Sequence, residues 1–491
     1  MSDHAAYQKA IATLKRRPKG ITAADLAAAT ALPLPTAREM VNRAADEFRG
    51  RLRVTESSEI LYDFPRGFTS RYRSLGARAG RFLDKCASVG LKILSWLFKA
   101  WILVMLFGYF ALFMLIALAA LVLSMAGGSS SDNRSRNSSG GGLFMATRIF
   151  DIIIRLWFYS ELTKSMTGSY RQAAPRPQGK PLHRAVFSFV FGEKDPNAGA
   201  EETEKRALIE YLGANRGLVS LPEYMAITGL GPLEAERGIL AFCAEFGGSP
   251  EATEEGTIVY RFQDILLRAE PGVRRSAVPA VPAGPGPLRR LRSFSSNSKT
   301  MNTWFGIVNS VNLLFGGYFF YQAFSTGIIR TTEQLQASPR LYGITYALIS
   351  SISENPHSVM LVGLGLVPLI FSFFFWIIPA LRFARLNHEN QAIKKRNLRK
   401  TGFRVIWEKL RGLVSADIGN SALGPGGAEA EQEKVITEMA VYSQPEVEVA
   451  GDGRTVYNFT ELEREKKALA ASRAAVNPGN FDIGKVIFDS E

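Results

Sequence analysis

Long apolar stretches without a single charge constrain this chain more than any other feature of its sequence. Residues 101–125 read WILVMLFGYFALFMLIALAALVLSM, and residues 303–324 and 359–381 are also free of charge. A helix needs roughly 20 such residues to cross a hydrocarbon core about 30 Å thick. Each of the three blocks is therefore long enough to span a bilayer, and the sequence predicts an integral membrane protein.

A fourth apolar block, residues 143–160, differs because it carries Arg148, Asp151 and Arg155. These side chains share one face of a helix. One interpretation is an interfacial helix whose charges lie at the headgroups or against a partner. The other is a spanning helix in which the three residues form an intramembrane polar cluster that lines a polar path. The sequence leaves both interpretations open.

The distribution of Lys and Arg predicts the orientation of these blocks. Basic residues are frequent before residue 101, before residue 303 and after residue 381, whereas the loop 325–358 has only Arg330 and Arg340. We expect the basic flanks to face the cytoplasm, next to anionic lipid headgroups. The simplest topology is four spans in two hairpins, with both termini cytoplasmic in a bacterial inner membrane, provided that residues 143–160 cross.

The polar parts of the chain show a recurring order of elements. In the first part we expect helices at residues 7–17, 23–30 and 37–48, with Thr22 as the cap of the second helix. Two short strands, 52–54 and 60–64, would then form a hairpin. A helix, a helix–turn–helix and a two-stranded wing is the winged-helix order.

Two later parts of the chain repeat features of this pattern. The letters RGLVS occur at residues 216–220 and again at 411–415. In the second copy a long helix, 232–246, precedes strand residues 257–262. The third copy is degenerate because Gly424-Pro425-Gly426-Gly427 interrupts it, but a DG turn at 452–453 predicts its hairpin.

Together these patterns predict a multidomain α-helical membrane protein with three winged-helix-like (α+β) cytoplasmic modules and about four transmembrane helices in two hairpins. The expected parts are module 1 (1–65), a basic juxtamembrane linker (66–100), the first membrane hairpin (101–160), a linker with the FSFVFG segment (161–198), module 2 (199–268), a Pro/Arg-rich linker (269–300), the second membrane hairpin (301–385), module 3 (400–468) and a C-terminal tail (469–491).

The formal net charge of +14 raises the question of nucleic-acid binding. The first module would present basic and amide side chains suited to phosphate and base contacts, or to a protein partner. These residues are Arg38, Asn42, Arg43, Arg51 and Arg53. The second and third modules are rich in Glu, which repels phosphate. We therefore expect those two modules to bind protein or to pack on one another.

Residue types that carry catalysis or metal binding are sparse. The chain has two cysteines and four scattered histidines, without metal-ligand spacing. It contains no P-loop, nucleophile elbow or dinucleotide fingerprint. We expect no enzymatic activity, no metal and no cofactor.

Three stretches resemble a family of uncharacterised cyanobacterial and plastid membrane proteins with winged-helix-like repeats. They are FSFVFGEKDPN at residues 187–197, the second module with its VYRF ending, and FDIGKVIF at 481–488. Some plant members carry an iron–sulfur cluster biosynthesis label, which the two cysteines of this chain do not support. The resemblance implies a membrane protein of unestablished role, and it transfers no catalytic residue.

The leading functional hypothesis is a membrane scaffold or adaptor whose modules mediate protein–protein contact or self-association. One alternative is a membrane-tethered transcription regulator that binds DNA through module 1. Another is a transport or lipid-handling protein built on the cluster of Arg148, Asp151 and Arg155. The expected partners are anionic lipids and either a second protein or further copies of this chain.

Overall fold

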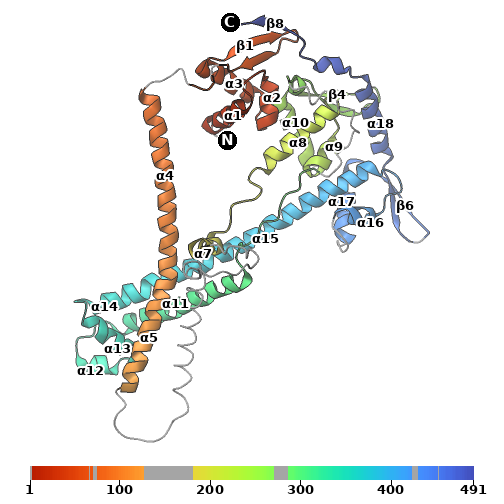
Figure 1. The fold of residues 1–491 in the computed structure, drawn as a ribbon. Helices are drawn as coiled ribbons and strands as arrows, with labels where there is room; N and C mark the ends of the chain where they lie inside the picture. Colours follow the sequence, from red (N-terminus) through yellow and green to blue (C-terminus); the bar gives the residue numbers. More distant parts are fainter. Residues whose placement is uncertain are drawn as a thin grey trace, which may run out of the picture. The chain divides into compact units, whose positions relative to one another are not determined.

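The computed structural model describes residues 3–65, 67–69, 75–126, 181–269, 286–422, 429–451 and 453–490. Within these residues the chain is mostly helical, with small sheets, and it divides into two compact units (Figure 1). The sheet-containing unit comprises Met1–Gly80, Asp195–Leu291 and Glu389–Glu491. The helical unit comprises Arg81–Lys194 and Arg292–His388.

Long helices dominate the helical unit. Helix α4 (Leu75–Leu103) continues through a π-helical segment, η1 (Val104–Gly108), into α5 (Tyr109–Ala126). A second π-helical segment, η4 (Val359–Leu366), leads into α15 (Val367–Glu408), which contributes to both units. The other helices of this unit are α7 (Leu182–Phe191), α11 (Lys299–Thr326), α12 (Thr332–Ala337), α13 (Arg340–Ser350) and α14 (Pro356–Ser358).

Two stretches of helix in the described residues are long and apolar enough to cross a membrane. They are Val89–Val122 and Pro356–Glu408, which contain most of the first and all of the third charge-free block. The remaining charge-free block, 303–324, lies within the continuous helix α11. Polar residues in that block, including Asn309 and Asn312, lower its hydropathy, and α11 is not among the two stretches. The fourth block, 143–160, lies outside the described residues.

Helix α11 packs closely against η4 because both carry glycine at the crossing. A methyl group on Gly365 would lie 2.8 Å from the Cα of Phe320, which is closer than side chains pack. Small residues at a crossing let two membrane helices approach closely. Side chains also reach the two π-helical segments: Asn312 donates to the Leu106 carbonyl at 2.8 Å, and the Tyr109 hydroxyl donates to the Gly363 carbonyl at 2.9 Å.

The segment FSFVFG forms part of α7 and is therefore helical. Its alternating Phe residues resemble a strand in sequence, but the helix places Phe187 and Phe191 on one side, with ring centres 4.8 Å apart, and Phe189 on another. Phe189 is buried among the helices, Phe187 is half-buried and Phe191 is exposed. The ring of Phe189 packs against Phe294 and Phe305, with ring centres 5.8 Å away in both cases.

In the sheet-containing unit, we call residues 1–65, 199–268 and 400–468 the first, second and third regions. The elements of the first region are α1 (Asp3–Arg16), α2 (Ala23–Thr30), α3 (Leu34–Phe48), β1 (Arg51–Thr55) and β2 (Ile60–Asp63). As predicted, Thr22 caps α2, and Asp25 completes a capping box. Helix α3 begins at Leu34, earlier than the predicted residue 37, because proline is tolerated in the first turn of a helix.

The second region has the same order of elements. They are α8 (Ala200–Ala214), β3 (Leu218–Val219), α9 (Leu221–Thr228), α10 (Pro232–Phe246), β4 (Gly248–Ala252), β5 (Ile258–Phe262) and the 3₁₀ turn η2 (Asp264–Leu266). The strands form an antiparallel sheet in the order β3–β5–β4. The predicted bounds of the long helix, 232–246, match α10.

The third region begins in the last turns of α15. It continues through α16 (Ser415–Ala422), α17 (Glu429–Tyr442) and the antiparallel hairpin of β6 (Glu446–Val449) and β7 (Thr455–Asn458). The predicted DG turn falls between these strands. Single β-bridges join Leu413 to Tyr457 here and Ile21 to Tyr62 in the first region. Residues 424–427 lie outside the described residues.

The C-terminal residues return to the N-terminal region. After α18 (Thr460–Ala475) and the 3₁₀ turn η5 (Pro478–Phe481), strand β8 (Val486–Asp489) pairs antiparallel with β1. The sheet order β2–β1–β8 therefore includes residues that the sequence assigned to a separate tail. Nothing in the local pattern of either strand indicates this pairing, because the strands are far apart along the chain.

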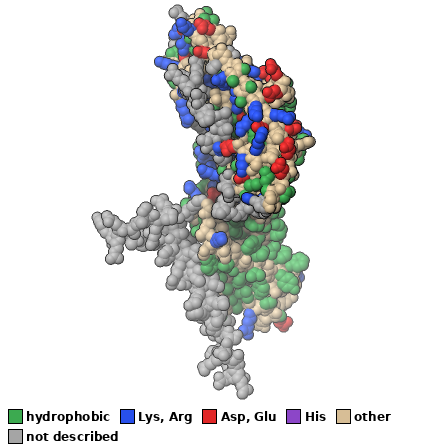
Figure 2. All heavy atoms as spheres, turned by 90° about the vertical axis from the view of Figure 1, so that its right-hand side faces the viewer, with side chains coloured by type: hydrophobic (Ala, Val, Ile, Leu, Met, Phe, Trp, Pro, Cys, Tyr) green, Lys and Arg blue, Asp and Glu red, His purple; other side chains and the backbone are tan. Residues whose placement is uncertain are grey.

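One hydrophobic core joins the three regions. Its buried side chains come from all of them, for example Leu26, Phe242 and Ile436. Helix α10 contacts both α3 and α17, and α2 contacts α8. Figure 2 shows charged side chains of both signs over the sheet-containing unit and hydrophobic side chains gathered over the helical unit.

Candidate functional site

Two of the five residues proposed for nucleic-acid or partner contact lie on α3 with intramolecular partners. The guanidinium of Arg43 forms an ion pair with Asp3 at 3.1 Å and lies 4.5 Å from the centre of the Tyr7 ring. The side-chain oxygen of Asn42 accepts a hydrogen bond from the Tyr62 hydroxyl. Both residues are exposed, but the Asn42 oxygen and one guanidinium nitrogen of Arg43 already have partners.

Two further residues lie on β1 and are also paired. Arg51 contacts Asp489 of β8 at 2.6 Å, and Arg53 contacts Asp63 of β2 at 2.7 Å. Arg38 is exposed on α3 and has no ion pair among the described residues. A phosphate group would therefore have to displace carboxylates from three of the four arginines, which reduces the attraction expected from sequence alone.

The third helices of the three regions are also in mutual contact. Helix α10 of the second region contacts α3 of the first region and α17 of the third. A reading helix must enter a groove about 12 Å wide to contact base edges. Packing between these helices favours contact within the protein over contact with DNA.

The polar cluster of Arg148, Asp151 and Arg155 lies outside the described residues. The structure therefore assigns these three residues no surroundings. The most strongly charged buried site that the structure describes lies elsewhere, in the sheet-containing unit.

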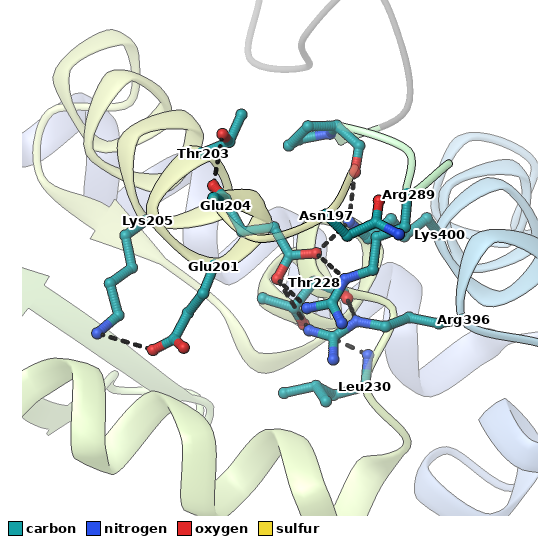
Figure 3. Close-up of polar contacts among 12 residues, drawn as sticks. Asn197, Glu201, Thr203, Glu204, Lys205, Thr228, Leu230, Arg289, Arg396 and Lys400 are labelled. Atoms are coloured by element: carbon teal, nitrogen blue, oxygen red, sulfur yellow. Dashed lines mark hydrogen bonds and ion pairs between the residues drawn. The ribbon is translucent and has the colours of Figure 1, made fainter. Parts of the chain in front are cut away.

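This site is built around Glu204 on α8, which is 5% exposed (Figure 3). Its carboxylate accepts two hydrogen bonds from Arg289, at 3.2 and 3.1 Å. Arg396 contacts the same carboxylate at 2.9 Å, and the ammonium of Lys400 contacts it at 2.7 Å. Arg396 and Lys400 both lie on α15. One carboxylate therefore joins α8, α15 and the segment that contains Arg289.

The cations of the Glu204 site are themselves fixed by backbone carbonyls. Lys400 donates to the Pro287 carbonyl at 2.6 Å, and Arg396 donates to the Thr228 carbonyl at 2.8 Å. Burial raises the pKa of Glu204, but hydrogen bonds from Arg289 and Lys400 outweigh burial and hold that pKa below its ordinary value. The carboxylate is therefore ionised at neutral pH and acts as a clamp.

A second set of ion pairs joins α15 to the third region. Arg399 contacts Glu438 of α17 at 2.6 Å and Glu234 of α10 at 3.7 Å, and Lys395 contacts Glu438 at 2.9 Å. The sequence interpretation treated these basic residues as a membrane flank. The structure adds a second role for these α15 residues, because acidic side chains on α8, α10 and α17 bind them.

A third site connects α18 to the second region. Two nitrogens of Arg473 contact the two carboxylate oxygens of Glu223, at 3.0 and 2.6 Å, and one of them also donates to the Leu218 carbonyl at 2.9 Å. Glu223 is 4% exposed and also belongs to the capping box of α9 with Ser220. This pair attaches the C-terminal helix to the sheet of the second region.

Near this pair lies a buried carboxyl group without a described cation. Glu465 of α18 is 8% exposed, and the Tyr442 hydroxyl lies 3.3 Å from one of its oxygens. The pKa of Glu465 is raised to about 7, mainly by burial. The hydrogen bond from Tyr442 lowers this pKa, and the negative charge of Glu223 raises it further. Glu465 therefore changes protonation near neutral pH.

These side chains suit structural clamping better than catalysis. Among the described residues, no group of three or more His, Cys, Asp or Glu side chains is placed to hold a metal ion. Burial raises the pKa of the Cys243 thiol to about 11, so the thiol is a poor nucleophile at neutral pH. Sequence patterns do not predict the clusters around Glu204, Glu438 and Glu223, because the residues that pair there are far apart in the chain.

The fold and these sites define a mostly helical protein with two membrane-length apolar stretches and an ion-paired body that carries small sheets. The chain is similar to an uncharacterised chloroplastic protein of Arabidopsis thaliana, with 24% identity over 414 residues that cover 81% of this chain and 71% of the relative. No family model and no solved structure match the chain. The similarity is consistent with the plastid side of the resemblance drawn from the sequence.

Proposed function

We propose that this protein is a membrane scaffold or adaptor in which three winged-helix-like modules pack on one another and present a surface to a protein partner. The observation that carries this proposal is the hydrophobic core that the three regions share, with ion pairs across the contacts. Lys9 pairs with Glu202 between the first and second regions, and Lys400 pairs with Glu204 between the third and second. These contacts hold the regions together and leave none of the paired basic groups available for an external phosphate.

The order of elements supports the winged-helix assignment of the three regions. In the first two, a capped second helix begins with a Thr22–Asp25 or Ser220–Glu223 capping box. The third helix ends in a left-handed residue, Arg49 or Gly247, and leads into a two-stranded hairpin. We take these shared details as marks of an internal repeat.

The membrane part of the proposal keeps four spans in two hairpins, with both termini cytoplasmic in a bacterial inner membrane. The two membrane-length helical stretches, the continuous helix α11 and the basic flanks support it. The relative is chloroplastic, so the type of membrane belongs to the proposal.

Helix α10 offers the most direct surface for a partner. Leu233 and Leu240 are 66% and 52% exposed on it, and they lie two turns apart on one face. The opposite face of α10, with Ile239, Phe242 and Phe246, packs into the core, so these leucines are left on the outer face with apolar surface that a partner could cover. We therefore expect the partner, or a second copy of this chain, to contact α10 at these residues.

Site-specific photo-crosslinking in membranes tests this surface. A photoreactive residue in place of Leu233 or Leu240 is expected to yield one discrete adduct, whereas the same residue in place of the exposed Glu210 on α8 is the matched control. Light scattering of the purified chain identifies self-association. A monomeric particle without an adduct at either leucine would refute the scaffold proposal.

The alternative of DNA binding through the first region has less support. Three of the four arginines proposed for contact are paired with carboxylates, and α10 contacts the third helix of this region. Salt-dependent binding of duplex DNA by the full chain would favour this alternative over the scaffold.

A further inference from the structure

Helices α4 and α7 of the helical unit border an apolar groove with a volume of about 350 Å³. Helix α15 forms its third side. The lining is entirely apolar and largely aromatic. Its residues are Phe98, Trp101, Ile102, Met105, Val190, Phe191, Val367, Ile370, Phe371, Phe374, Phe375 and Ile378.

A second pocket lies between the same two helices and has the opposite character. Its volume is about 330 Å³, and its lining contains three permanent cations and a histidine. None of the described residues that line it is acidic. The lining residues are Leu91, Lys92, Ser95, Trp96, Lys99, His183 and Arg184.

The two pockets follow one another along residues 91–105 of α4 and η1, and they lie toward opposite ends of α7. The ammonium of Lys99 lies 4.6 Å from the centre of the Phe187 ring, which is at the border between them. One turn further along α7, the ring of Phe191 lies 5.8 Å from that of Phe98, and both rings line the apolar groove. A basic pocket and an apolar groove therefore neighbour one another along one helix pair.

This sequence of surfaces matches the amphipathic shape of a lipid. An anion in the basic pocket meets three cationic side chains, and the apolar groove has no polar side chain to receive a soluble ligand. Trp96, in the wall of the basic pocket, is a residue type that prefers the headgroup level of a membrane. Basic pockets between membrane helices bind phosphate headgroups.

We propose that the helical unit binds one anionic glycerophospholipid, with its phosphate at Lys92, Lys99 and Arg184 and one acyl chain in the groove lined by Trp101 and Phe371. The occupant is a membrane lipid and not a free phosphate, because the cations and the apolar groove neighbour one another along the same two helices. This site is independent of the scaffold proposal, which rests on the sheet-containing unit.

Native mass spectrometry of the full chain in detergent tests the site with two lipids, dioleoyl phosphatidylglycerol and dioleoyl phosphatidylcholine. The chain is expected to bind the first lipid at least about tenfold more tightly. The triple variant Lys92→Gln, Lys99→Gln and Arg184→Gln is expected to lose this preference. The matched control changes the exposed lysines 194, 299 and 394 to Gln and is expected to keep it.

Two further measurements separate a lipid from a soluble anion. Ile370→Trp places a larger side chain in the exposed mouth of the groove and is expected to weaken phosphatidylglycerol binding several-fold with all cations in place. Millimolar inorganic phosphate is expected not to displace the lipid. Equal affinity for both lipids, retention of the preference in the triple variant, or displacement by phosphate would each overturn the proposal.

Discussion

Glu204 and Glu465 are carboxyl groups buried to a similar degree in the sheet-containing unit, yet their surroundings are opposite. Glu204 is 5% exposed and contacts Arg289, Arg396 and Lys400. Glu465 is 8% exposed and lies beside the hydroxyl of Tyr442. The pKa of Glu204 is lowered, whereas the pKa of Glu465 is raised to about 7.

The difference teaches that partners, more than burial, determine the charge of these two groups. Burial alone raises the pKa of both carboxyls. Three cations reverse that effect at Glu204 and make it a permanent clamp between helices α8 and α15. Without a cation, Glu465 favours the neutral form and makes the contact between α17 and α18 sensitive to pH.

Removing the charge of Glu204 is expected to have the largest effect on stability. Glu204→Gln leaves the buried Lys400 and the half-buried Arg289 and Arg396 without their carboxylate, which costs about 3–5 kcal/mol of unfolding free energy. Chemical unfolding of the full chain in detergent measures the loss. The control Glu201→Gln, whose side chain is 78% exposed on the same helix, is expected to change stability by less than about 0.5 kcal/mol. Equal losses in both variants would contradict the clamp.

Removing the charge of Glu465 is expected to stabilise the chain, whereas removing that of Glu204 destabilises it. The size of the gain should depend on pH. The folded pKa of about 7 lies above the ordinary value of 4.5, so this group favours folding fully below pH 4.5 and loses that contribution as pH rises through 7. At pH 8, Glu465→Gln is expected to stabilise the full chain by about 3 kcal/mol, with little effect at pH 4.5.

Unfolding at several pH values, with the wild-type chain and Glu465→Gln side by side, checks this expectation. The difference in unfolding free energy between the two should grow between pH 4.5 and pH 8. A difference that does not vary with pH would show that the carboxyl group is already ionised in the folded chain.

A single cation at the Glu204 site is expected to matter less than the carboxylate. Arg396→Gln leaves Arg289 and Lys400 on the carboxylate but removes the hydrogen bond to the Thr228 carbonyl. The expected cost is about 1–2 kcal/mol, and Glu204 stays ionised. The same unfolding experiment measures it. A loss as large as that of Glu204→Gln would mean that the three cations do not share the carboxylate.

Removing the Tyr442 hydroxyl is expected to change the unfolding free energy less than any of the substitutions above. Its hydrogen bonds to Glu465 are long, at 3.4 and 3.3 Å, and they lower the pKa of Glu465. Tyr442→Phe should therefore raise that pKa slightly and destabilise the chain at pH 8 by about 0.5 kcal/mol. A carboxyl stretching band followed by infrared titration reports the pKa. A lower pKa in the variant would contradict the assigned role of Tyr442.

Local signals in the sequence predicted much of the secondary structure. Thr22 with Asp25 three residues later predicts the start of α2, and the Asp452-Gly453 turn predicts the hairpin of β6 and β7. Charge-free length predicts the two membrane-length stretches. In all these cases the determining residues are neighbours in the chain.

Contacts between distant segments could not be predicted in the same way. Glu204 is an ordinary member of a Glu-rich helix by sequence, and only the fold brings Lys400 to it. Strand β8 pairs with β1 from the other end of the chain, and Arg51 finds Asp489 there. No local periodicity records such pairings, so the basic residues of the first region were interpreted as free.

The central claim is that the three regions and helix α15 pack on one another, with ion pairs across the contacts. Zero-length carbodiimide cross-linking of the protein in its membrane tests it, because this reagent joins only amines and carboxylates in direct contact. Lys9 lies 2.6 Å from Glu202, and Lys395 lies 2.9 Å from Glu438. We predict amide cross-links at both pairs, unchanged by added duplex DNA. Absence of both cross-links, or their loss on addition of DNA, would contradict the account.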